Sequence, residues 1–200
     1  MPMLYAIAHF LRDKMPWLWD LVDMLNSFLF SLRYGGKQKS VENRVLTIYE
    51  KESGMKIIPM SQVVTDKLVD FFARQPEEAY RFFKPHGFDA KSIKKLQRNK
   101  AFLAYVLLDG HQISGYCFNR SFFHGKGFRG RMVDIDYRGM GWGTMMNKIL
   151  NEVGFGIGIR LFETVNKDNI ASYRSAMSAS NVRILKELED KDLYLEILKV

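Results

Sequence analysis

The sequence contains a single cysteine, Cys117, among its 200 residues. One cysteine excludes an internal disulfide, and its position in the apolar run ISGYCF predicts a buried strand residue and not a nucleophile. The expected location is therefore a reducing compartment, the cytoplasm. Zinc-ligand spacings, aromatic and basic RNA-binding motifs, helix-turn-helix patterns, internal repeats and low-complexity segments are also missing from the sequence. We expect no metal site and no nucleic-acid partner.

Acidic residues are fewer than basic residues, 22 against 30, which gives a net charge of +8. Such an excess favours a polyanionic ligand, a membrane surface or an acidic acceptor. The hydrophobic share of 47% and the aromatic share of 14% are enough for one well-packed domain. Disorder is therefore not expected.

The N-terminal part is very apolar but has no uncharged stretch long enough to span a bilayer. Pro16 suits the first position of a helix that continues PWLWDLVDMLNSFLFSLRY, and Asp20 and Asp23 fall inside any candidate transmembrane window. No small-residue cleavage site follows, so this is not a secretion signal. Residues 1–34 must lie against the rest of the chain, against a second copy in a homodimer, or peripherally on a membrane.

The pair Gly35-Gly36 and the polar residues after it are typical of a linker. We therefore predict two parts, an N-terminal helical extension with its linker over residues 1–40 and the main domain over 41–200. The segment RVLTIYEKESGMKIIPM predicts a hairpin around Ser53-Gly54, and helices are expected from Val64, from Pro76 and over 92–98.

Strand patterns dominate the middle of the chain. AFLAYVLL and QISGYCFNRSFF flank Asp109-Gly110, which predicts an antiparallel hairpin, and FRGRMVDID is a third strand. Farther on we expect a helix over 141–153 that Gly154, Gly156 and Gly158 end, then a strand RLFETV and a helix from Asn169. An amphipathic helix with Val182, Ile184, Leu185 and Leu188 and a final strand LYLEIL complete the expected order.

The stretch MVDIDYRGMGWGTMMNKIL, which begins at Met132, has the pattern of a strand, a tight turn and a helix. Gly139, Gly141 and Gly143 let backbone N–H groups converge on one point at the start of the helix, which favours phosphate binding, and Arg138 adds a positive charge. Close packing alone is the other interpretation. A dinucleotide-binding turn is a further alternative, with Glu163 as its ribose-binding acid.

Val133, Asp136 and Tyr137 followed by RGMGWG resemble the acetyl-CoA-binding signature of the GNAT superfamily of N-acyltransferases. LFETVNKDNIASYRSA resembles the next part of that signature, and the likeness covers residues 55–200. The resemblance implies an α+β fold: a mixed, mostly antiparallel central sheet flanked by helices, here with an N-terminal helical extension.

The resemblance also implies acetyl-CoA as cosubstrate and assigns its contacts. The pyrophosphate would lie on the backbone N–H groups of the turn, and the pantetheine would pair with the strand before it and meet the helix after Val165. The residues so implied are Met132, Val133, Asp134, Arg138, Gly139, Met140, Gly141, Trp142, Gly143, Asn169 and Ser172.

The sequence departs from the family pattern at the residue for proton transfer. Ala176 stands where many relatives have a tyrosine that acts as general acid to the leaving thiolate. Tyr173 lies on a different helical face, and Ser172 and Ser175 are weak substitutes. Glu163 is the first candidate for a general base, followed by His124, His86 and Asp134, the last expected at the surface. Deprotonation of the acceptor amine through water is equally admissible.

The resemblance implies transfer of an acetyl group to an amine of a small-molecule acceptor. FKPHGF, the basic helix and FFHGKGFRGR are similar to GNAT proteins of surface-polysaccharide biosynthesis, which indicates an amino sugar as acceptor. Two alternatives stay open, a non-catalytic acyl-CoA-binding module and a dinucleotide-binding oxidoreductase.

Overall fold

The computed structural model describes residues 16–199, where one sheet holds seven strands in the order β1-β2-β3-β4-β5-β7-β6. Neighbouring strands are antiparallel except for β4 and β5, which are parallel. The part of the predicted N-terminal extension before residue 16 lies outside the described residues. The strands are β1 (Lys56–Pro59), β2 (Phe102–Asp109), β3 (Gln112–Ser121), β4 (Lys126–Val133), β5 (Arg160–Asn166), β6 (Asn181–Glu187) and β7 (Asp192–Leu198).

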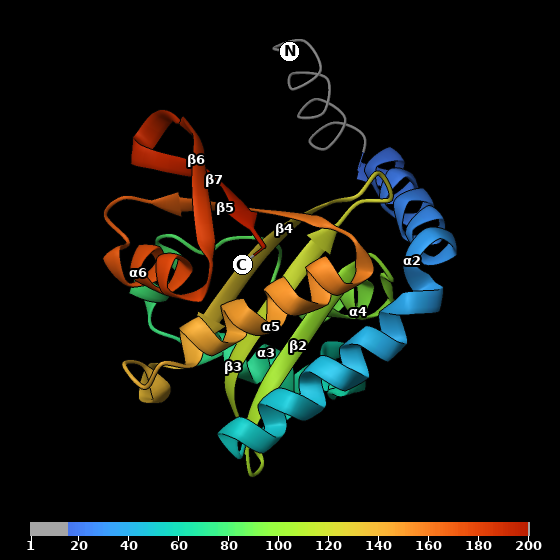
Figure 1. Cartoon of the computed structure of the whole chain (residues 1–200). Coiled ribbons are helices and arrows are strands. Elements are labelled where there is room, and N and C mark those ends of the chain that lie inside the picture. The colour runs from blue at the N-terminus through green and yellow to red at the C-terminus, as the bar shows by residue number, and fades with distance from the viewer. Residues whose placement is uncertain (1–15, 200) are drawn as a thin grey trace.

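Helices cover both faces of the sheet (Figure 1). On one face α2 and α5 pack on a core that contains Tyr105, Leu150 and Leu161. On the other face α3 and α4 pack on a second core with Phe72 and Tyr116. The predicted fold class is confirmed. The helices are α2 (Pro16–Ser53), α3 (Thr65–Ala73), α4 (Ala90–Arg98), α5 (Trp142–Ile157) and α6 (Ile170–Ala179), with short 3-10 turns η1 (Met60–Gln62), η2 (Glu77–Tyr80), η3 (Ile135–Tyr137) and η4 (Glu189–Lys191).

The predicted linker is wrong, because α2 continues as one helix through Gly35 and Gly36. Two helical glycines cost about 1 kcal/mol each, but Tyr34 before them and Val45 after them are buried in the same core. The predicted hairpin at Ser53-Gly54 is also wrong: Gly54, with φ +71°, follows the end of α2, and only β1 comes after it. The predicted boundary between the N-terminal extension and the main domain, near residue 40, therefore falls inside α2. It stays a prediction.

Residues 181–187 form the edge strand β6 and not the predicted helix. Val182 and Ile184 are β-branched, and a bulge between Ile184 and Lys186 accommodates Leu185, which hid the alternating pattern of a strand. The expected strand LYLEIL, the hairpin of β2 and β3 and the buried position of Cys117 are confirmed.

Helix α5 does not end at Gly154 but runs to Ile157, and Gly158 with φ +91° ends it. The two glycines inside the helix allow close approach. A Cβ at Gly154 would lie 2.8 Å from Leu161 Cδ1, and one at Gly156 would lie 2.6 Å from Val41 Cγ1. These contacts set how α5 lies on β5 and on α2.

Gly156→Ala should destabilise the protein by about 1–3 kcal/mol, because Val41 is β-branched and cannot turn its Cγ1 away cheaply. Gly36→Ala is the control: it adds a Cβ to open space in α2 and should stabilise by about 1 kcal/mol. Thermal unfolding measures both. Val41→Ala added to Gly156→Ala should restore most of the loss, and a loss independent of Val41 would contradict this packing of α5 on α2.

Candidate active site

The central feature of the site is the divergence of β4 and β5. The two strands pair only from Lys126–Arg160 to Phe128–Phe162. Strand β3 stays with β4 as far as Val133, and β7 stays with β5 as far as Asn166, so the sheet opens along one line. A cleft of about 1140 Å³ occupies the opening and extends to the turn before α5. From residue 129 onward, the edge of β4 that faces β5 therefore has no strand partner among the described residues.

The turn before α5 has the predicted strand, turn and helix geometry. Gly139 and Gly141 have φ of +79° and +85°, which favour glycine, and no side chain caps the start of the helix. A Cβ built at either glycine meets nothing within 4 Å, so close packing does not explain them. The first N–H groups of a 16-residue helix therefore point to open space at one end of the cleft, with the exposed Arg138 beside them.

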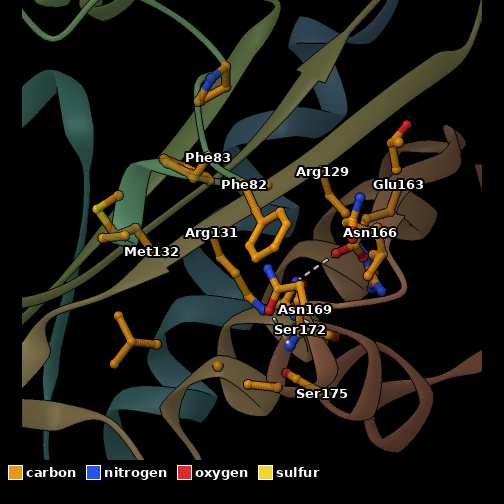
Figure 2. Close-up of a pocket in the computed structure, with 18 of the residues that line it drawn as sticks. Phe82, Phe83, Arg129, Arg131, Met132, Glu163, Asn166, Asn169, Ser172 and Ser175 are labelled. Carbon is orange, nitrogen blue, oxygen red and sulfur yellow. Dashed lines mark hydrogen bonds and ion pairs between the residues drawn. The ribbon is translucent and has the colours of Figure 1, made fainter. Parts of the chain in front are cut away.

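A buried ion triad joins the diverging strands at the cleft wall (Figure 2). Arg129 Nε donates to Glu163 Oε2 at 2.6 Å, and Arg131 Nη1 donates to Glu163 Oε1 at 2.8 Å. Arg129 also donates to Asn151 of α5 at 2.5 Å, and Arg131 donates to the carbonyl of Ser172 in α6 at 2.9 Å. The triad thus connects β4 and β5 with the two helices beside the cleft.

Glu163 is a poor general base, so the sequence-based assignment needs correction. Burial alone would raise the pKa of its carboxyl, but the charges of Arg131 and Arg129 and their hydrogen bonds hold that pKa below the ordinary 4.5. Both carboxylate oxygens are occupied by guanidinium groups. Because both of its oxygens accept from arginines, Glu163 is also not free to bind the ribose of a dinucleotide.

Helix α6 presents three of the predicted residues to the cleft: Asn169, Ser172 and Ser175 (Figure 2). Asn169 Oδ1 caps the helix by accepting from the Ser172 N–H at 3.2 Å. Ser175 Oγ accepts from Asn147 Nδ2 at 3.3 Å and lies 3.4 Å from Thr144 Oγ1, both on α5. Because the Ser175 oxygen accepts from the Asn147 amide, its hydroxyl hydrogen can be donated to Thr144 Oγ1 or to a bound ligand.

Tyr173 does not lie in the cleft. Its ring packs against the small core of Val165, Leu193 and Leu195, since its place on α6 turns it toward β5 and β7. Ala176, where a catalytic tyrosine was sought, is fully buried. Among the described residues that line the cleft, Ser172 and Ser175 are therefore the candidate acids that remain from the sequence analysis. Arg131 Nη2 donates to Ser172 Oγ at 3.1 Å, so Ser172 also belongs to the contacts of the ion triad, and we favour Ser175.

Asp134 is not the surface residue that we predicted. It is fully buried at the end of β4, where its Oδ2 accepts from Arg74 Nε at 2.9 Å and from Gln75 Nε2 at 2.6 Å. Its Oδ1 accepts from the Asp136 N–H at the start of η3. The carboxylate therefore fixes the approach to the glycine turn, and only the backbone of Asp134 stays a candidate for cofactor contact.

The two candidate histidines lie away from the cleft. His86 Nε2 is 3.0 Å from Tyr116 Oη, and burial among aromatic rings lowers the pKa of His86 to about 4, so its ring is neutral at pH 7. His124 stacks on Phe122 in the turn before β4. No group of three His, Cys, Asp or Glu side chains in residues 16–199 could hold a metal ion.

The opposite wall of the cleft was missed by the sequence analysis. It combines rings with cations: Arg81 lies over the Phe82 ring at 4.9 Å, and Arg120 lies over the Phe102 ring at 5.7 Å. The Phe118 ring lies over Gly130 of β4. A Cβ at Gly130 would lie 2.6 Å from that ring, so the packing requires glycine. The alternation in FRGR could have revealed Arg129 and Arg131 on one face. The lining residues of this wall include Arg81, Phe82, Phe83, Lys84, Phe118, Arg120 and Phe128.

No protein-family profile matches the chain, and no curated protein matches it. Among solved structures, the GNAT domain of S. lividans PAT superposes with a TM-score of 0.62 at 15% identity, over 72% of this chain and 89% of that one. The acetyltransferase yncA from Salmonella typhimurium gives 0.55 at 16% identity, over 72% and 93%. Campylobacter jejuni PseH gives 0.54 at 14% identity, over 73% and 99%. This chain has the GNAT fold.

The GNAT fold removes the oxidoreductase alternative. Dinucleotide-binding folds have an open, mostly parallel sheet. Here β4, α5 and β5 form one parallel βαβ unit, but the other neighbouring strands of the described sheet are antiparallel. This mostly antiparallel sheet does not match a dinucleotide-binding fold.

Glu163→Gln should lower the free energy of unfolding by about 3 kcal/mol or more, because it leaves two buried guanidinium groups without a counter-charge. Denaturant unfolding measures this. Glu187→Gln, which breaks an exposed pair with Lys167, is the control and should cost less than about 1 kcal/mol.

The lowered pKa of Glu163 also makes the free energy of unfolding depend on pH. Because the folded pKa of Glu163 lies below its unfolded value, its ionised form stabilises the fold above about pH 4.5, and this contribution is lost as pH falls through the folded pKa. The wild type should lose that contribution in acid and Glu163→Gln should not. If Glu163→Gln left the stability in acid unchanged but removed the rise of activity with pH, Glu163 would instead be the base.

Proposed function

We propose that the protein transfers an acetyl group from acetyl-CoA to an amine of a small molecule. The observation that carries the proposal is a cleft between two diverging strands that ends on the uncapped start of α5. Two structures of similar fold support it by their ligands: yncA was solved with acetyl-CoA, and the aminoglycoside acetyltransferase AAC(6')-Ib with coenzyme A and kanamycin.

The residues present fit the cosubstrate. The backbone N–H groups from Arg138 to Gly143 would hold the pyrophosphate, helped by the helix dipole and the Arg138 charge. The free edge of β4 at Val133 would pair with the pantetheine amides, beside the Met132 side chain, and Asn169 and Ser172 would flank them from the start of α6. A Cβ at Gly143 would lie 3.4 Å from Ser175 Oγ, so a side chain at this position would extend into the space between the turn and α6.

The acceptor would lie along the wall of rings and cations. Arg120 and Lys84 lie on that wall, together with Arg81, and they favour an acceptor that bears a negative group such as a phosphate. The ring of Phe82, which is 39% exposed, offers apolar surface for a sugar ring. An amino sugar with an anionic substituent fits both properties.

The chemistry needs little from the protein beyond position. The acceptor nitrogen attacks the thioester carbonyl carbon, the carbon–sulfur bond breaks, and the amine loses a proton while the thiolate gains one. Ser175 would supply a proton or a hydrogen bond to the sulfur. Hydrogen bonds with Asn147 and Thr144 fix the position of its hydroxyl oxygen. The amine would lose its proton to water, since Glu163 is a poor base.

A non-catalytic acyl-CoA-binding module is the alternative function, and Ala176 favours it. Thiol release from acetyl-CoA, measured over a panel of amino sugars, other amines and peptides, decides between the two. Binding of acetyl-CoA without release by any acceptor would support the module.

Gly143→Val should abolish measurable acetyl-CoA binding by isothermal titration while the thermal midpoint stays close to wild type. A Cβ at this position meets only ordinary contacts in the ligand-free fold and needs no positive φ, whereas the valine side chain would occupy the phosphate-facing turn. Gly36→Val, in open space on α2, is the matched control and should bind normally. Normal binding by Gly143→Val would place the phosphate site elsewhere.

Ser175→Ala should lower kcat by roughly a hundredfold with little change in the KM for acetyl-CoA, because it removes the donor near the sulfur. Tyr173→Phe and the exposed control Ser178→Ala should keep most of the activity. We expect kcat/KM to rise with pH along one limb and then stay level, with no descending limb from a tyrosine near about pH 10. A large loss in Tyr173→Phe would contradict this assignment.

A further inference from the structure

The N-terminal half of α2 carries an exposed apolar stripe. Its members recur every three or four residues, which places them within one side of the helix. Trp17, Met24 and Leu32 are 64%, 63% and 70% exposed, whereas Phe30 and Tyr34 on the other side are buried in the core. The stripe consists of Trp17, Leu21, Met24, Leu25, Phe28 and Leu32.

A row of cations borders this stripe. Helix α4 lies beside α2 across a groove of about 790 Å³, to which Met24 and Phe28 contribute. Lys95 pairs with Asp20 and Asp23 of α2, and the Lys100 N–H donates to Ser27 Oγ at 2.8 Å, so the two segments are joined. The cations are Lys91, Lys94, Arg98 and Lys100; all four are exposed, and none has an ion pair within residues 16–199.

We propose that this α2–α4 surface docks on a bilayer that contains anionic lipids. The apolar stripe would enter the interface between headgroups and acyl chains, and the α4 cations would meet the headgroups. The stripe extends along α2 beyond the groove, so a soluble anion in the groove would leave most of it in water. None of the described helices is long and apolar enough to cross the membrane, which fits a helix that lies in the interface.

Charge also argues for lipid over a second copy of the chain. A two-fold contact whose axis crosses α2 would bring the α4 cations of both copies together, and like charges repel. An anionic bilayer supplies the opposite charge over the whole surface. The proposal rests on α2 and α4 alone and is independent of acyl transfer.

Flotation of the full chain with vesicles tests the proposal. The protein should float with phosphatidylcholine vesicles that contain phosphatidylserine and stay behind with phosphatidylcholine alone. Lys91→Glu/Lys94→Glu/Arg98→Glu should weaken partitioning by about a hundredfold. The control Lys51→Glu/Lys56→Glu/Lys67→Glu makes the same change in net charge at exposed positions elsewhere and should bind nearly as the wild type does.

The stripe has its own variants and its own reporter. Leu25→Ser/Phe28→Ser should release the protein from the vesicles, whereas Ile48→Ser/Val64→Ser, at exposed apolar positions outside the stripe, should not. Trp17 fluorescence, isolated by Trp19→Phe/Trp142→Phe, should shift to the blue on binding. The proposal is overturned if the wild type does not float, if the two charge variants bind equally, or if the stripe variant instead abolishes a dimer seen in ultracentrifugation without vesicles.

Discussion

The structure depends on three charges that join two strands where their pairing ends. Arg129 and Arg131 on β4 share Glu163 of β5 just beyond the last paired residues. Burying such charges costs free energy that their mutual attraction offsets only with good geometry, to which the bonds to Asn151 and Ser172 contribute. Because the same triad touches α5 and α6, it fixes the width of the cleft together with the helices that line it.

In the proposed reaction the cleft would act by position and by fixed dipoles. The start of α5 directs its N–H groups at one end, and the free edge of β4 continues from there. Opposite them, cations lie beside aromatic rings, as Arg81 does over Phe82. A reaction in which the nucleophile and the thioester are both bound can gain most of its acceleration from proximity, which suits a site with a serine in place of a tyrosine acid.

Local patterns predicted the parts of the molecule that local chemistry decides. The glycine spacing of RGMGWG predicted the turn, and Asp109-Gly110 predicted the hairpin, because each needs particular backbone angles. The failures came where distant contacts decide. Gly35 and Gly36 stay helical because α2 packs on the sheet. The bulge at Leu185 hid β6, and Glu163 and Asp134 lost their predicted roles to arginines from other elements, which no spacing along the chain reveals.

Hydrogen exchange of the full chain, with and without acetyl-CoA, tests the central claim most directly, because the claim names the backbone that meets the cosubstrate. The account predicts slower exchange at the amide of Val133 and at those of the turn from Gly139 to Gly143, with no change in α4 (Ala90–Arg98). Slower exchange confined to the α2–α4 groove, or none at saturating acetyl-CoA, would contradict the assignment of the cleft between β4 and β5 as the cosubstrate site.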